Sequence, residues 1–247
     1  MDNKLNEIFG FLISNRLYNH NLQERIYKSV VMPYEDTKDK VISLLYHFAN
    51  SQSKPKIDAL ANTYKSIIPD NNCFSSFTNF VEKINLQRPV VINYANLFNG
   101  MKCQDGWGDK TAALFTKSIY HLHNGQYANQ LRIWDDVPNS IAGNDVFYLP
   151  VDEVIKFIFR KLDKKTKWNF NNVNEILKTK YNNQEIEVWD DLWFWGFITQ
   201  YGSGDNRNFL WNENKYWALK ESDKDPQMII KIQKDAEIFL RIISNDN

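Results

Sequence analysis

The sequence predicts an all-α protein, and three features support that prediction. Apolar side chains recur at helical spacing along most of the chain. Glycine and proline account for only 9 and 7 of the 247 residues, too few for a fold built from many tight hairpins. Strand character is confined to two short stretches, 148–150 and 186–188. The length suits one large domain or two interleaved helical lobes, and we expect a single domain over 1–247.

Prolines and polar turns divide the first part of the chain into helices. Pro33, the turn 51–55 and the turn 69–72 mark the breaks, because proline and short polar clusters interrupt helices. Pro89 is placed to open a helix, since proline suits the first helical turn. The expected helices are 5–13, 22–31, 37–49, 57–68, 74–84 and 89–98.

Composition excludes several classes of protein. Cys73 and Cys103 are the only cysteines, so they cannot supply a four-thiolate iron–sulfur cluster or a four-cysteine zinc site, and four histidines without a CxxC or HExxH motif do not indicate a structural metal. We therefore expect two reduced thiols, no metal and no cofactor. No apolar run approaches the ~20 residues of a membrane span, and the N-terminus does not resemble a signal peptide. These features predict a soluble cytoplasmic protein that does not bind membranes.

The charge balance argues against binding to nucleic acid by total charge alone, because 30 basic residues face 30 acidic ones. A local basic groove is still compatible with a net charge of zero. The stretch 153–167 carries an excess of basic residues: Lys156, Arg160, Lys161, Lys164, Lys165 and Lys167. This pattern fits a solvated helix face and a phosphate-contacting face equally well.

A glycine-rich turn between two helices is the most informative segment. The first helix should end near Met101 and the second should start at about Asp109, within a hairpin spanning roughly 90–120. Gly106 and Gly108 flank Trp107 and permit unusual backbone angles and a close approach of another backbone. The start of the second helix offers unpaired amide groups and a positive dipole end, which together suit one phosphate of a nucleic-acid strand. A glycine turn between two core helices is the alternative interpretation.

Two side chains near this turn and after it are further candidates for a functional role. Lys110 falls in the first turn of the second helix, where the positive dipole end lowers the proton affinity of its amine and favours a nucleophile. Asp152, in the segment 148–160, follows Pro150 and should cap the next helix. A helix cap and a catalytic carboxylate are compatible roles for the same side chain.

These segments together resemble the helix-hairpin-helix DNA glycosylase superfamily, and within it the archaeal-type 8-oxoguanine DNA glycosylases. The matching features are Gly106, Gly108, Lys110 just after the second glycine, and Asp152 within Pro-Val-Asp. The resemblance implies a two-lobed helical bundle with the active site in the cleft between the lobes, acting as a monomer on double-stranded DNA with a damaged base. It also implies that the base is flipped out and excised, and that the strand is then cleaved by AP lyase chemistry through a Schiff base on the lysine.

The late segment 187–200 adds candidates for the base pocket. Trp193 and Gly196 match a Trp-x-x-Gly pattern of the family, with Asp190 on the same helical face. Asp191 with Trp195 is the alternative register, and a tryptophan-rich core helix is a further interpretation. Gln23 matches an early glutamine that reads the base in the family. Trp107 and Trp195 join Trp193 as candidates for stacking on the base.

The sequence departs from the family in one region and leaves two other functions open. Lys110 and Asp152 are separated by more chain than is usual, and the excess falls in 121–149, so the identity of the excised base stays open. One alternative is a glycosylase-fold protein that binds DNA or acts on another modified base, for example in defence against phage. The other is a helical interaction protein whose hairpin motif arose by chance.

Overall fold

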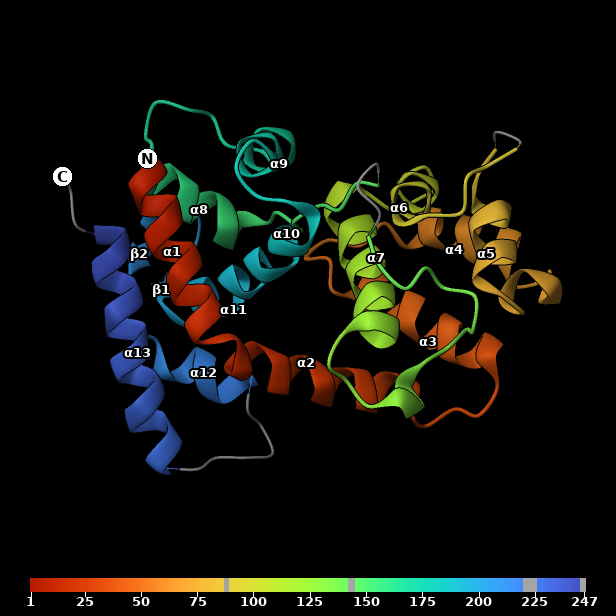
Figure 1. Ribbon diagram of the computed structural model, residues 1–247, viewed down its shortest axis with the longest axis horizontal. Coiled ribbons are helices and arrows are strands. Elements are labelled where there is room, and N and C mark those ends of the chain that lie inside the picture. Colours follow the sequence, from red (N-terminus) through yellow and green to blue (C-terminus); the bar gives the residue numbers. More distant parts are fainter. Residues whose placement is uncertain (87–88, 142–144, 220–225, 245–247) are drawn as a thin grey trace. The chain divides into compact units, whose positions relative to one another are not determined.

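The computed structural model describes residues 1–86, 89–141, 145–219 and 226–244, which are mostly helical (Figure 1). The prediction of an all-α protein is therefore confirmed at the level of fold class. The described residues also form one small antiparallel sheet, in which Gln200 pairs with Phe209 and Tyr201 pairs with Asn208. The chain divides into two compact units, each built from separate stretches of sequence.

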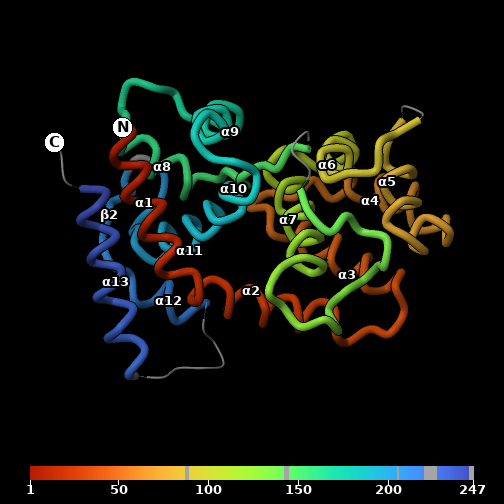
Figure 2. Tube along the Cα trace, in the orientation of Figure 1, coloured from red at the N-terminus to blue at the C-terminus, as the bar shows by residue number. Residues whose placement is uncertain are grey.

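Unit 1 comprises Met1–Leu22, Val151–Lys180 and Val188–Asn247. Its elements are α1 (Asp2–Ser14), α8 (Glu153–Leu162), α9 (Phe170–Lys178), α11 (Asp191–Ile198), β1 (Gln200–Tyr201), η3 (Gly204–Asn206), β2 (Asn208–Phe209), α12 (Glu213–Leu219) and α13 (Pro226–Ser244). Helices α1 and α13, the first and last helices that the structure describes, lie side by side in this unit (Figure 2). Two helices cross the boundary between the units: α2 (Arg16–Val31) and α10 (Asn183–Trp189).

The core of unit 1 is centred on a fully buried tryptophan. Trp195 of α11 meets Phe11 of α1 edge-on, with ring centroids 4.8 Å apart, and also contacts Phe239 of α13. Helix α11 packs closely on α8 because Gly196 has no side chain: a Cβ there would lie 2.7 Å from atoms of both Val154 and Ile158. This close approach sets the position of α11 relative to the start of α8.

Unit 2 comprises Gln23–Pro150 and Tyr181–Glu187. Its elements are α3 (Thr37–Asn50), α4 (Ile57–Ile67), η1 (Asn71–Phe74), α5 (Phe77–Ile84), α6 (Tyr94–Lys102), α7 (Asp109–Asn124) and η2 (Asn129–Leu131). Helices α6 and α7 pack against each other, and α5 packs on α6. Aromatic side chains fill the space between them: Phe77, Phe80, Tyr94, Phe115 and Trp134.

The structure corrects three local predictions. The stretch 186–188 is helical, because Asn182 and Glu185 cap the start of α10 reciprocally, each side chain accepting from the other's backbone amide. The stretch 148–150 forms no strand either, and the small sheet lies at β1 and β2 instead. The sixth helix begins at Tyr94 and not at Pro89, since Asn93 caps it by accepting from the Asn96 amide at 2.9 Å.

Candidate functional site

The turn between α6 and α7 adopts the backbone geometry that its glycines suggested. Gly106 has φ +81°, a conformation that favours glycine, and a Cβ there would lie 2.9 Å from Leu60 of α4. The turn is anchored on α4 by the Thr63 hydroxyl, which donates to the Asp105 carbonyl at 2.7 Å. A second anchor is the Gln52 amide, which donates to the Gly106 carbonyl at 3.2 Å. The turn is therefore fixed before any ligand arrives.

The start of α7 is open. Gly108 is the N-cap residue and offers no side chain to the first amide groups of the helix, and a Cβ there would meet nothing within 4 Å. Such an exposed helix start is suited to an anionic group. Lys110 is half-buried in this first turn, and among the residues that the structure describes its amine has no hydrogen bond or ion pair.

Lys102, at the end of α6, has an acidic partner. The Lys102 amine lies 2.7 Å from the Asp109 carboxylate, and that contact raises the pKa of Lys102. Lys102 is therefore held as a cation, while Lys110, which follows Asp109 in the sequence, has no such partner in the described chain. The Trp107 side chain is not free to stack on a base, since it is buried with its ring edge-on to Phe115.

Asp152 and Trp193 meet in unit 1. Asp152 caps α8 with its Oδ1 atom, which accepts from the amides of Val154 at 2.9 Å and Ile155 at 3.1 Å. Its other oxygen, Oδ2, accepts from the indole N–H of Trp193 at 3.0 Å. Both side chains are half-buried and so remain partly open to solvent. Two residues far apart in the sequence, each selected for its own pattern, thus form one polar contact.

Two side chains beside Trp193, one aromatic and one cationic, were not among the site residues predicted from the sequence. Phe197 stacks on Trp193, with ring centroids 4.9 Å apart and planes 13° apart. The Lys215 amine lies 4.9 Å from the Phe197 ring centroid and donates to the Gln200 carbonyl at 2.7 Å. Burial, together with the positive charge of Arg207, lowers the pKa of Lys215. Phe197 follows Trp193 by one helical turn and had a sequence signal, whereas Lys215 had none.

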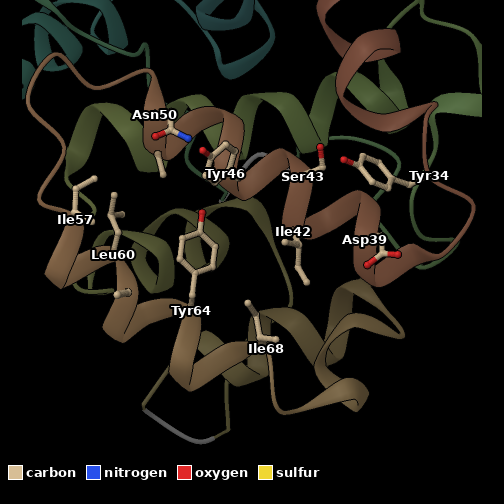
Figure 3. A pocket seen from close by; sticks show the side chains of 12 residues that line it. Tyr34, Asp39, Ile42, Ser43, Tyr46, Asn50, Ile57, Leu60, Tyr64 and Ile68 are labelled. Atoms are coloured by element: carbon tan, nitrogen blue, oxygen red, sulfur yellow. The ribbon is translucent and has the colours of Figure 1, made fainter.

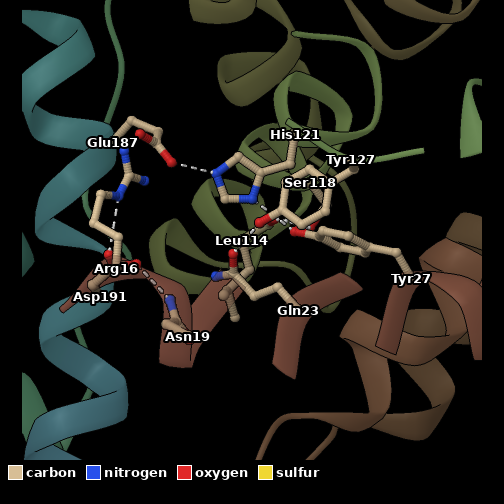
Figure 4. Close-up of polar contacts among 10 residues, drawn as sticks. All are labelled: Arg16, Asn19, Gln23, Tyr27, Leu114, Ser118, His121, Tyr127, Glu187 and Asp191. Atoms are coloured by element: carbon tan, nitrogen blue, oxygen red, sulfur yellow. Dashed lines mark hydrogen bonds and ion pairs between the residues drawn. The ribbon is translucent and has the colours of Figure 1, made fainter. Parts of the chain in front are cut away.

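The two aspartates that begin α11 occupy different surroundings. Asp191 is buried, where it accepts from Asn19 at 2.7 Å and pairs with Arg16 at 3.1 Å (Figure 4). These contacts tie α11 to the start of α2 within unit 1. Asp190 is also buried and stands at the N-cap position of α11, where its side chain makes no capping bond. Trp195 faces the core, so the geometry favours Trp193 over Trp195 as the tryptophan that borders a ligand.

Gln23 belongs to a buried polar cluster in unit 2. Its side-chain oxygen accepts from the Tyr127 hydroxyl at 2.6 Å (Figure 4). Next to it, His121 bridges the Tyr27 hydroxyl at 3.0 Å and the Glu187 carboxylate at 2.8 Å. Gln23 is therefore held by a neighbour through the same amide group that a base-reading glutamine would use.

Side chains of the segment 121–149 cap helices of unit 2. Asp136 accepts from the amides of Phe77 at 2.7 Å and Thr78 at 2.9 Å, and so caps α5. Asp145 caps α6 in the same way, through the amides of Tyr94 and Ala95. The Trp134 indole donates to the Phe74 carbonyl. These contacts give the segment 121–149 a structural role.

Unit 2 also contains a cavity of about 490 Å³ between α3 and α4 (Figure 3). It is mostly apolar, with tyrosines 34, 46 and 64 among its lining residues. The Tyr64 hydroxyl is buried without a hydrogen-bond partner in the described chain, and burial raises its pKa to about 12. None of the predicted site residues lines this cavity.

Comparisons of the chain with models of protein families, with curated proteins and with solved structures found no match. Within the described residues, no helix combines the length and apolar character needed to cross a membrane. Lys110 belongs to unit 2 and Asp152 to unit 1.

Proposed function

We propose that this protein is a DNA glycosylase with AP lyase activity, built on a helix-hairpin-helix element. The observation that carries the proposal is the hydrogen bond from the Trp193 indole to the Asp152 carboxylate. A glycosylase needs a fixed carboxylate beside the sugar and an aromatic surface beside the flipped base. The Asp152–Trp193 contact supplies both groups in one unit. The open helix start after Gly106 and Gly108 supports the proposal independently.

Asp152 is suited to stabilise positive charge on a sugar. Breaking the bond between C1′ and the base leaves an oxocarbenium-like sugar, which a nearby anion favours. The two amides at the start of α8 and the Trp193 indole orient the carboxylate, so little reorganisation is needed during the reaction. The stacked pair of Trp193 and Phe197 offers a half-buried aromatic surface, and stacking contributes about 1–3 kcal/mol per base.

Lys110 is the proposed nucleophile. Its neutral amine attacks C1′, the bond to the base breaks, and the departing base takes up a proton. The amine and C1′ then form a Schiff base as the sugar ring opens, and loss of the C2′ proton eliminates the 3′ phosphate. The hairpin amides hold a phosphate of the strand near this amine. The proposal requires that Lys110 and Asp152 act on the same nucleotide in the DNA complex.

The proposed substrate is double-stranded DNA with a damaged base, and 8-oxoguanine is the first base to test. The segment 121–149 caps helices of unit 2, and the identity of the excised base stays open. A different modified base is the second substrate class under the same chemistry.

Borohydride trapping on a panel of duplexes tests the proposal. Each duplex carries one damaged or modified base, or an abasic site, and borohydride reduces a Schiff base to a stable protein–DNA adduct. We expect an adduct with the wild-type protein, none with Lys110→Gln, and a much slower release of base with Asp152→Asn. Lys102→Gln is the matched control, because it removes a positive charge that contacts Asp109 from the end of α6 and leaves the Lys110 amine in place.

The panel also separates the competing functions. An adduct on a lesion other than 8-oxoguanine assigns the second substrate class. DNA binding without release of any base would contradict a glycosylase, and absence of binding at low salt would favour a helical interaction protein. Trapping by Lys110→Gln at the wild-type level would contradict the role of that lysine. In that case Lys215→Gln becomes the next variant, since the pKa of Lys215 is lowered and it lies beside the aromatic pair.

A further inference from the structure

Unit 1 has a pocket that is lined with basic side chains and contains neither Asp152 nor Trp193. Its volume is about 370 Å³, and its walls come from the second half of α8, from β2 and from the end of α13. The charged residues that line it are Arg160, Lys161, Lys164 and Arg207. Among the described residues that line it, none is an aspartate or a glutamate. The pocket therefore concentrates positive charge in a chain whose net charge is zero.

One lining arginine is paired with a carboxylate of the same helix. Glu153 accepts from the Arg160 guanidinium at 3.1 Å and also pairs with Lys156, which lies outside the pocket. Glu153 is thus shared between two cations, and only one of them, Arg160, lines the pocket. Lys164 is exposed at the rim, so its amine can reach a ligand in solution.

Aromatic side chains position the two arginines. Phe157 stacks on Phe209 of the small sheet, with ring centroids 4.5 Å apart and planes 27° apart. The guanidinium carbons of Arg160 and Arg207 each lie 5.9 Å from the centre of the Phe157 ring. Arg207 also donates to the Gln200 side chain at 2.7 Å. An arginine that is already held in place loses less conformational entropy when it binds a phosphate.

We propose that this pocket binds the phosphate group of a nucleotide, either free or within a nucleic-acid strand. Two planar guanidinium groups and two lysines match a phosphate, because guanidinium donors bind its oxygens in pairs and lysine adds a point charge. The stacked phenylalanines offer an apolar surface next to the phosphate for the rest of the nucleotide. The volume falls within the range of small-ligand sites. This proposal does not depend on glycosylase activity.

Binding measurements on full-length charge variants test it. The probes are inorganic phosphate, deoxythymidine monophosphate and a short single-stranded oligonucleotide. Calorimetry measures the binding of the two small probes, and fluorescence anisotropy measures the binding of the oligonucleotide. Lys161→Gln/Lys164→Gln removes two charges from the pocket. Lys165→Gln/Lys167→Gln removes the same number of charges from the adjacent chain outside it, where both lysines are exposed. Circular dichroism verifies that both variants fold.

We expect the pocket variant to bind at least about tenfold more weakly than the wild type, and the control variant to bind nearly as well as the wild type. For the oligonucleotide, the slope of log affinity against log salt should flatten by about 1.4, since each phosphate contact on a single strand contributes about 0.7. Binding of the mononucleotide would assign a free nucleotide, and binding of the oligonucleotide alone would assign a strand. Equal losses in both variants, or no binding of any probe to the wild type, would overturn the proposal.

Discussion

The Asp152 carboxylate uses its two oxygens for two different contacts. Oδ1 caps α8, and Oδ2 accepts from the Trp193 indole. The capping role was predictable from Pro-Val-Asp-Glu, because an aspartate before an apolar helix is a common N-cap. The contact with Trp193 was not, since it joins segments that only the fold brings together. The cap fixes the carboxylate, and the indole fixes which way its second oxygen points.

Removal of the indole donor should slow base release without unfolding the protein. Trp193→Phe keeps an aromatic ring but loses the N–H that donates to Asp152. We expect the single-turnover rate of base release to fall roughly tenfold, because a hydrogen bond to a charged group contributes roughly 1.5–3 kcal/mol. Trp217→Phe is the matched control: its indole donates to the Glu213 carboxylate at 2.9 Å on an exposed part of α12. Equal effects of the two substitutions would contradict the positioning role of Trp193.

Lys178 gives a pH dependence of stability with a defined sign. Burial lowers its pKa to about 8. Between that value and the usual lysine pKa near 10.4, the unfolded chain holds a proton that the folded chain has released, so the free energy of unfolding rises with pH across this window. Below it, the buried charge destabilises the fold.

Lys178→Met should therefore stabilise the protein at neutral pH. We expect its Tm at pH 7 to exceed that of the wild type by about 2–4 °C. This is the Tm shift that a gain of roughly 1 kcal/mol in the free energy of unfolding produces in a chain of this size, and the gain is kept small because Lys178 is partly exposed. The advantage should shrink as the pH is raised from 8 to 10. Lys165→Met, at an exposed position, should leave Tm unchanged at each pH. A stability difference that does not vary with pH would contradict the burial of this amine.

Helix packing explains why Asp152 and Trp193 are neighbours. Gly196 lets α11 approach α8 closely, and Asp152 stands at the start of α8. The Trp-x-x-Gly pattern thus combines a side chain that faces a partner with a glycine that permits the approach. The aromatic character of this helix was evident in the sequence, but the direction in which each tryptophan points depends on its packing partners.

Two glycines in helices should respond to alanine in opposite directions. Gly196→Ala places a Cβ 2.7 Å from Val154 and Ile158, and overpacking of this kind costs about 1–3 kcal/mol. Gly10→Ala on α1 meets nothing within 4 Å and should stabilise the protein by about 0.5–1 kcal/mol through helix propensity. Urea titration of both variants checks this. Destabilisation by Gly10→Ala, or none by Gly196→Ala, would contradict the packing described here.

The segment 121–149 supplies caps to helices that lie far from it in the sequence. Asp136→Ala should cost about 0.5–1 kcal/mol of stability, because the amides of Phe77 and Thr78 lose their acceptor. Asp135→Ala is the control, since the neighbouring carboxylate accepts neither amide. Burial raises the pKa of Asp136, but the hydrogen bonds from Thr78 and Phe77 outweigh it and lower the pKa. The cap is therefore fully effective above pH 4, and its contribution is lost as the pH falls through the lowered pKa.

Local signals in the sequence predicted most helices, and their failures have physical causes. Pro33 marked the end of α2, and α3 begins at Thr37 as expected. The β-branched run 90–92 looked helical by spacing, yet Asn93 is the better N-cap and moves the start of α6 to Tyr94. The start of α10 carried a readable signal in Asn182 and Glu185, which strand-like alternation over 186–188 obscured.

Long-range contacts were beyond what the sequence could show. The zero net charge argued against binding to nucleic acid by total charge alone, and the basic stretch 153–167 was visible in the sequence, but only the structure brings Arg207 to the same pocket as Arg160, Lys161 and Lys164. Arg207 enters that pocket only because the small sheet folds back on α8, where Phe209 stacks on Phe157. Likewise, the burial of Asp191 by Arg16 and Asn19 follows from contacts between the N-terminal helices and α11. Such pairings have no local pattern in the chain.

The most direct test of the proposed function is to locate the covalent bond. Wild-type protein is incubated with duplex DNA that contains 8-oxoguanine or an abasic site, reduced with borohydride and digested, and the modified peptide is identified by mass spectrometry. We predict an adduct on the Lys110 side chain. An adduct on Lys215 or any other amine, or an unmodified protein after complete reduction, would contradict the assignment of Lys110 as the nucleophile.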